Sequence, residues 1–170
     1  MYLIYNLLLI IVFILFVLPY YTYRLFTEKG FSRRFRQSLG RVHNKEIEKV
    51  MRKDCIWIHG ASVGEIVATS PLVKQIRQEM PDRPILVSAF TLGGYNMAKQ
   101  IIPEADAIIF FPLDLPFVAE SMVKRIHPGI FMPVETELWP NFLRAIRERH
   151  IPVMMVNGRI SESYGRVLVG

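Results

Sequence analysis

The sequence predicts an α/β fold, a Rossmann-like layer of parallel strands covered by helices and preceded by one transmembrane helix. Short apolar runs alternate with helix-length segments, a pattern typical of a parallel sheet with helices on both faces. A longer apolar stretch stands before the first run. The five runs that we expect to form strands are residues 55–59, 85–90, 107–111, 129–134 and 152–157.

The apolar stretch at residues 2–23 predicts a membrane-spanning helix. It carries no charged side chain, and about 22 residues at a rise of roughly 1.5 Å match a hydrocarbon core of about 30 Å. The sequence lacks the positive charge before the stretch and the small residues after it that mark a cleaved signal peptide. We therefore expect a retained anchor, with Pro19 and the tyrosines that follow it at the membrane interface. The alternative is a buried core helix.

The net charge of +6 is concentrated in residues 24–53, which hold ten basic and three acidic side chains. The chain beyond residue 53 is nearly neutral, with eleven basic and twelve acidic side chains. Because the positive charge follows the apolar stretch, we expect everything after Arg24 to face the cytoplasm. This charge then reports topology and membrane contact, and we expect no nucleic acid partner. The expected division is an anchor at 1–23, a basic juxtamembrane segment at 24–53 and a Rossmann-like domain at 54–170.

The basic segment also predicts an amphipathic helix. Phe31, Phe35 and Leu39 recur every four residues, and the arginines fall elsewhere on the helical wheel. Such a helix can lie on anionic lipid, or it can be a linker helix that packs its phenylalanines on the domain. The pattern leaves both open. The candidate contacts to lipid head groups are Arg33, Arg34 and Arg36.

The sequence predicts neither a disulfide nor a metal site. Cys55 is the single cysteine and lies in an apolar run, so it can form no intramolecular disulfide. The four histidines show no spacing typical of zinc ligands. Of these histidines, only His59 stands at the end of an expected strand, where it can equally be a buried structural residue.

The loop after the first expected strand contains the strongest candidate for chemistry. Gly60 and Gly64 flank the start of a helix, where backbone N–H groups can bind phosphate, but the spacing matches neither a dinucleotide fingerprint nor a Walker A loop. Ser62 and Glu65 have the spacing of a capping box, in which Glu65 would bond back to the Ser62 N–H. Alternatively, Glu65 accepts a proton from a substrate hydroxyl.

Two acids follow the fourth expected strand. Glu135 and Glu137 precede Leu138-Trp139-Pro140, in which the proline suits the first turn of a helix. Acids at this end of a parallel strand face the place where such sheets bind ligands, which suggests hydroxyl or cation binding. The alternative is that one carboxylate caps the following helix while the other is solvated.

Four motifs in order resemble the family of Kdo transferases, which add 3-deoxy-D-manno-octulosonic acid (Kdo) to a lipid A precursor in lipopolysaccharide synthesis. They are Ser-Val-Gly-Glu at 62–65, Pro-Leu-Asp-Leu-Pro at 112–116, Glu-Thr-Glu-Leu-Trp-Pro-Asn at 135–141 and Asn-Gly-Arg-Ile-Ser-Glu at 157–162. The resemblance implies the GT-B architecture of two Rossmann-like domains, the first for the lipid acceptor and the second for most of the CMP-Kdo donor. We expect residues 54–170 to be the first domain, and the chain to be a fragment without the donor domain.

The resemblance also implies roles for particular residues. Glu65 would be the general base that deprotonates the lipid hydroxyl, and no metal or cofactor is implied. The residues that would bind substrate are Ser62, Gly64, Glu135, Glu137, Arg159 and Ser161. The implied location is the inner membrane, with a single-pass anchor and a cytoplasmic domain. The alternatives are a non-catalytic, membrane-anchored lipid-binding module and a nucleotide-binding oxidoreductase domain.

Overall fold

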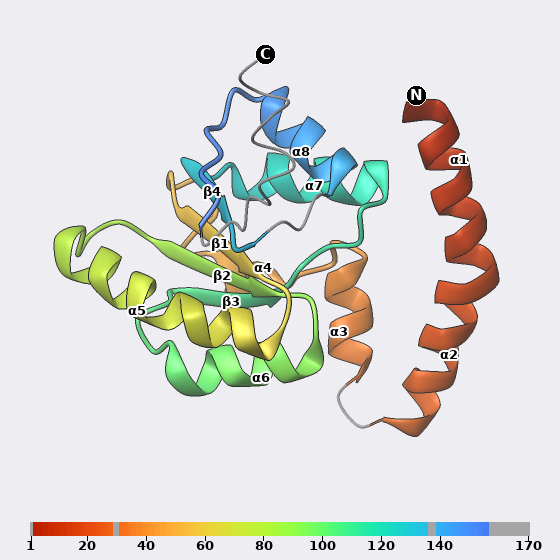
Figure 1. Ribbon diagram of the computed structural model, residues 1–170, viewed down its shortest axis with the longest axis horizontal. Coiled ribbons are helices and arrows are strands. Elements are labelled where there is room, and N and C mark those ends of the chain that lie inside the picture. Colours follow the sequence, from red (N-terminus) through yellow and green to blue (C-terminus); the bar gives the residue numbers. More distant parts are fainter. Residues whose placement is uncertain (1, 29–30, 136–138, 157–170) are drawn as a thin grey trace, which may run out of the picture.

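The computed structural model describes residues 2–28, 31–135 and 139–156. One helix at the N-terminus, Ile4–Thr27, is long and apolar enough to cross a membrane, and little of it is buried. It consists of α1 (Tyr2–Val12), a π-helical turn η1 (Phe13–Val17) and α2 (Leu18–Thr27). Figure 1 shows this helix running beside the rest of the molecule rather than within it.

The domain is a parallel sheet of four strands with helices between them (Figure 1). The spatial order is β3-β2-β1-β4, and every neighbouring pair is parallel. The strands are β1 (Ile56–Gly60), β2 (Ile85–Ala89), β3 (Ala107–Phe110) and β4 (Ile130–Pro133). The helices that follow them in turn are α5 (Val63–Glu79), α6 (Leu92–Ile101), α7 (Pro116–Ile126) and α8 (Pro140–Arg147). The structure therefore confirms the predicted α/β class.

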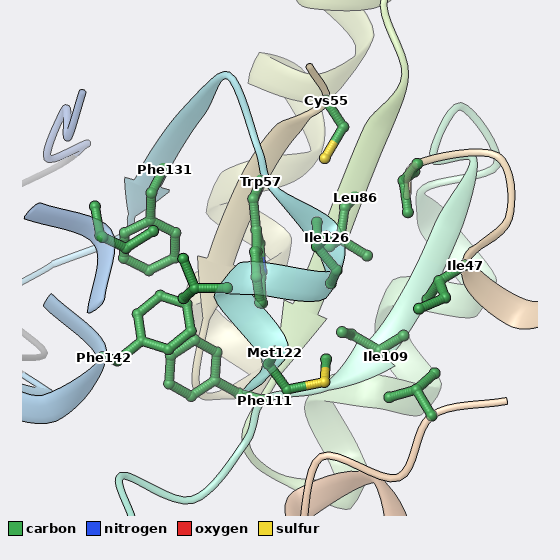
Figure 2. Close-up of a cluster of buried hydrophobic side chains, with 14 of the residues drawn as sticks. Ile47, Cys55, Trp57, Leu86, Ile109, Phe111, Met122, Ile126, Phe131 and Phe142 are labelled. Atoms are coloured by element: carbon green, nitrogen blue, oxygen red, sulfur yellow. The ribbon is translucent and has the colours of Figure 1, made fainter. Parts of the chain in front are cut away.

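Alternate residues of each strand enter two separate cores, one on each face of the sheet. On one face Ile58 packs with Val87 and with residues of α5 and α6. On the other face Trp57 packs under α7 and α8, with Phe131 at 5.9 Å and Phe142 at 5.1 Å between ring centroids. Figure 2 shows these aromatic rings gathered beside Trp57. Helices on both faces make the layer doubly wound, so ligands are expected at the carboxyl ends of its strands.

The fifth expected strand, residues 152–157, is only partly formed. Pro152, Met154 and Val156 are bonded to the outer edge of β4 through backbone hydrogen bonds, but the pairing counts as two isolated parallel bridges. The interruption lies at Pro133, which has no N–H with which to continue the ladder. The structure confirms that residues 152–156 lie beside β4. The prediction that they form a continuous fifth strand is wrong.

The basic segment contributes two helices, α3 (Phe31–Ser38) and α4 (Asn44–Ile47). α3 covers the free edge of β3, where the Phe110 N–H donates to Gln37 Oε1 at 2.9 Å. Phe31 is fully buried and meets Tyr21 of α2 edge to face at 5.1 Å. Phe31 is therefore packed, but its ring partner is the N-terminal helix and not the domain on which the linker-helix interpretation placed it.

Candidate functional site

The loop between β1 and α5 holds Glu65 in a fixed position. Ser62 is the N-cap of α5 and accepts the Glu65 N–H at 3.3 Å, as a capping box predicts. The Glu65 carboxylate accepts the Ser62 hydroxyl at 2.7 Å and the Ala61 N–H at 2.8 Å. The backbone N–H that Glu65 accepts is therefore that of Ala61, and not that of Ser62 as the capping box predicted. Each carboxylate oxygen has one of these bonds and retains a further acceptor site.

The two glycines of this loop differ in what surrounds them. A Cβ on Gly60 would lie 3.2 Å from Glu65 Cβ and 3.3 Å from Ile66 Cδ1, so the close approach of the loop requires glycine there. A Cβ on Gly64 would meet nothing nearer than Ser62 Oγ at 4.0 Å. Gly64 is exposed, and its missing side chain leaves the surface beside Glu65 open.

Glu135 lies at the same rim of the sheet. Continuing the register of β1 and β4, in which His59 pairs with Pro133, brings Ala61 beside Glu135. Glu135 is half-buried and has a positive φ of 63°, and its N–H donates to the Val156 carbonyl at 2.9 Å. A left-handed glutamate is a strained conformation of a kind that clusters at functional sites.

Three other expected site residues, Glu137, Arg159 and Ser161, lie outside the described residues. The residues that the structure brings together at one rim are therefore Ser62, Gly64, Glu65 and Glu135.

Asp114 caps α8, a role that the sequence pattern did not predict. Its Oδ1 accepts the Phe142 N–H at 2.8 Å, and its Oδ2 accepts the Asn141 N–H at 3.0 Å. The carboxylate that accepts the first N–H groups of α8 is thus Asp114, whereas one alternative had assigned the cap to one of Glu135 and Glu137. The sequence did hold a signal for a distant cap. Trp139, at the N-cap position of α8, has no side-chain oxygen with which to accept the first N–H groups of the helix.

Asp114 is also held in an unusual environment. Only 4% of its surface is exposed, and burial raises the pKa of its carboxyl despite the hydrogen bonds from Asn141 and Phe142, which lower it. Tyr5 of α1 donates a further hydrogen bond to Oδ2 at 2.9 Å. The 112–116 and 135–141 motifs and the N-terminal helix therefore meet at one carboxylate.

His59 and Cys55 have structural surroundings. The His59 ring stacks on Phe111 at 3.8 Å, and its Nδ1 lies 3.1 Å from both the carbonyl and the hydroxyl oxygen of Ser88. Burial raises the pKa of the Cys55 thiol to about 12, so it stays protonated at neutral pH. Within the described residues, no group of three or more His, Cys, Asp and Glu side chains could hold a metal ion.

The three candidate lipid contacts have different surroundings. The Arg34 guanidinium lies over the rings of Tyr21, Phe31 and Phe90, at 5.3 to 5.8 Å from their centroids. Arg33 forms an ion pair with Glu46 at 3.4 Å. Arg33 and Arg36 also line a hollow of about 540 Å³, together with Glu46 and with Lys99 of α6, so that three cations and one carboxylate border it. This hollow is a cationic surface beside the free edge of the sheet.

A doubly wound parallel sheet with acids and open backbone at its carboxyl rim fits a Rossmann-like glycosyltransferase domain. Residues 33–167 match the family model described as 3-deoxy-D-manno-octulosonic-acid transferase (kdotransferase). The chain belongs to this family, in its N-terminal domain.

Individual relatives agree with this assignment. The chain is 36% identical over 116 residues to the 3-deoxy-D-manno-octulosonic acid transferase of Haemophilus influenzae, covering 66% of this chain and 27% of the relative. The enzyme of the same name from Chlamydia muridarum is 33% identical over 109 residues, 64% of this chain and 25% of the relative. A bifunctional glycosyltransferase/methyltransferase of Fusobacterium nucleatum is 34% identical over 126 residues, covering 72% of this chain and 20% of the relative. The chain thus matches about a quarter of the length of these relatives.

Proposed function

We propose that this chain is the acceptor side of a Kdo transferase, the first Rossmann-like domain of a GT-B glycosyltransferase. In this proposal the enzyme moves Kdo from CMP-Kdo to a lipid A precursor during lipopolysaccharide synthesis, and the CMP-Kdo donor is held mainly by a second domain. The observation that carries the proposal is the Glu65 carboxylate. It is fixed by two hydrogen bonds at the start of α5, next to the open surface of Gly64.

Glu65 has the geometry that a general base needs. The donors Ala61 N–H and Ser62 hydroxyl hold its carboxylate in place at the N-terminal end of α5. An acceptor hydroxyl that arrives over Gly64 would donate to a remaining lone pair of the carboxylate. As the hydroxyl oxygen attacks the anomeric carbon, its proton passes to Glu65, the bond to the phosphate oxygen breaks, and CMP leaves with inversion.

The other site residues have supporting roles in this proposal. Ser62 orients Glu65, and Gly64 leaves room for the acceptor hydroxyl. The residues proposed to bind substrate, besides these two, are Glu135, Glu137, Arg159 and Ser161. The residues proposed to contact lipid head groups are Arg33, Arg34 and Arg36, with Arg33 and Arg36 reaching them from the cationic hollow.

We place the protein at the cytoplasmic side of the inner membrane. The divisions 1–23, 24–53 and 54–170 then correspond to the anchor, the basic juxtamembrane segment and the acceptor-side domain. The helix Ile4–Thr27 is the proposed anchor. Its length and composition would allow a single-pass crossing of the bilayer, whereas its hydrogen bonds to Asp114 and Asn141 favour an in-plane orientation instead.

The test is an exchange of domains with the Haemophilus influenzae relative. Its N-terminal segment is replaced by residues 1–170, and Kdo transfer from CMP-Kdo to a lipid A precursor is measured in membranes. We expect transfer. A folded chimera that binds lipid A precursor vesicles without transferring Kdo would instead favour the lipid-binding module. Binding of NAD by the 170-residue chain would favour the oxidoreductase alternative.

A further inference from the structure

The N-terminal helix presents one stripe of side chains to the domain. Side chains on this stripe are less exposed than the other residues from Ile4 to Tyr23; they are Tyr5, Asn6, Leu9, Phe13, Val17 and Tyr21. An α-helix turns about 100° per residue, so positions four apart drift around its axis. The wider π-helical turn η1 offsets this drift and keeps the stripe on one side. The opposite face is apolar and exposed, and includes Ile4, Leu7, Leu8, Ile11, Ile14 and Leu15.

Both ends of this stripe are held by the domain. At the N-terminal end, Tyr5 donates to the Asp114 carboxylate, and the Asn141 amide donates to Asn6 Oδ1 at 2.8 Å. Asp114 and Asn141 are 4% and 1% exposed, so these bonds satisfy buried polar groups. At the other end, Tyr21 is buried against Phe31. Figure 1 shows the helix lying alongside the domain, with α3 next to α2.

These contacts and a membrane crossing exclude each other. With Arg24 at the cytoplasmic surface, the nineteen residues back to Tyr5 would place Tyr5 roughly 28 Å deeper, near the far side of the bilayer. Asp114 and Asn141 would have to follow Tyr5 into the hydrocarbon. They belong to a domain whose α8 carries Arg144 and Arg147, and charged side chains in hydrocarbon are costly.

We propose that α1–α2 stays docked along the domain and enters the membrane sideways, lying in the plane of the cytoplasmic leaflet with its exposed apolar face among the acyl chains. The occupant of that face is an anionic lipid bilayer. The charge supports this choice, because residues 28–53, directly after the helix, carry nine basic against three acidic residues, and basic residues next to an apolar face favour anionic lipid surfaces.

The docked helix also brings the bilayer to the rim of the sheet. A cavity of about 370 Å³ separates the helix from the domain, lined by Val17, Tyr20 and Tyr21 on one side and by Arg34, Phe90 and Leu113 on the other. Phe90 and Leu113 follow β2 and β3, at the carboxyl ends of the strands. The docking itself rests on the contacts alone. Its value in bringing a lipid acceptor to Glu65 rests on the proposed function.

Cysteine labelling tests the docking without any measurement of transfer. Cys55 is fully buried and is changed to alanine, and one cysteine is added before Met1 of the full chain. Spheroplasts are treated with a membrane-impermeant maleimide before and after permeabilisation. Phe117→Cys, at an exposed position on α7, is the control for a cytoplasmic site. We expect the N-terminal cysteine to behave like Phe117→Cys and to react only after permeabilisation.

A second variant tests whether the polar contacts hold the helix. Tyr5→Leu together with Asn6→Leu removes the partners of Asp114 and Asn141 and makes the helix more apolar. We expect labelling of the N-terminal cysteine in intact spheroplasts to rise in this variant. Labelling of the unmodified helix in intact spheroplasts would overturn the proposal, and so would a double variant that remains as protected as the unmodified helix.

Discussion

Replacing Asp114 by asparagine tests the link between the 112–116 and 135–141 motifs. Asparagine has one acceptor oxygen, so one of the Asn141 and Phe142 N–H groups would face its NH₂ group instead of an acceptor. A buried N–H without an acceptor costs about 1–3 kcal/mol, and the substitution removes the cost of burying a charge. We expect a net loss of about 1–2 kcal/mol, which corresponds to a fall in melting temperature of about 2–8 °C for a chain of this size.

The assay is urea unfolding in detergent micelles, followed by tryptophan fluorescence. Trp57 packs against Phe142 of α8, so its emission reports the docking of that helix. Asp82→Asn, at an exposed position, is the matched control and should change the free energy of unfolding by less than about 0.5 kcal/mol. An Asp114→Asn protein as stable as this control would refute the capping role.

The pH dependence gives a second check on the same residue. Burial raises the pKa of Asp114 above 3.8, so the folded state takes up the proton more readily than the unfolded state. This contribution to the free energy of unfolding is full below pH 3.8 and is lost as the pH rises through the folded-state pKa. The Asp114→Asn variant should lack this dependence, and parallel curves for the two proteins would contradict the assignment.

Three further predictions concern the rim and the core. Glu135→Gly should be more stable than Glu135→Ala by about 1 kcal/mol, because glycine tolerates the positive φ, and equal unfolding free energies would argue against strain. Gly60→Ala should lower the free energy of unfolding by about 1–3 kcal/mol, because the added Cβ overpacks the loop. Gly64→Ala places its Cβ in open space at the start of a helix, so the free energy of unfolding should stay the same or rise slightly. Calorimetry of the two variants checks the difference. Between pH 9 and about pH 12 the free energy of unfolding should fall by up to about 1.4 kcal/mol per pH unit because the unfolded Cys55 thiol ionises first, and Cys55→Ala should lack this slope in denaturant titrations.

Local patterns predicted most of the fold. The apolar runs predicted all four strands of the sheet, because a parallel strand buried on both faces reads as a continuous apolar segment. The spacing of Ser62 and Glu65 predicted the cap of α5, since both partners lie within one helical turn. Pro140 was likewise expected in the first turn of a helix, and the structure confirms it.

What the sequence could not predict depends on contacts between distant residues. Asp114 caps a helix that begins 26 positions later in the chain, and Tyr5 reaches it from α1. The pairing of residues 152–156 with β4 is interrupted because Pro133 faces them and has no N–H to donate. Which segment Pro133 faces depends on the order of the strands in the sheet. Arg34 has the charge of a lipid contact, yet its stacking on three aromatic rings becomes visible only when α2, α3 and the end of β2 are brought together.

The rate of Kdo transfer by a Glu65→Gln variant tests the central claim most directly. In the chimera with the Haemophilus influenzae relative, glutamine keeps the size of the side chain and loses the base, so we expect the rate constant to fall by about 10²–10⁴-fold, with binding of lipid A precursor vesicles unchanged. Glu65→Asp, which keeps the carboxylate, should retain more activity than glutamine. Transfer by Glu65→Gln at the unmodified rate would contradict the assignment of Glu65 as the general base.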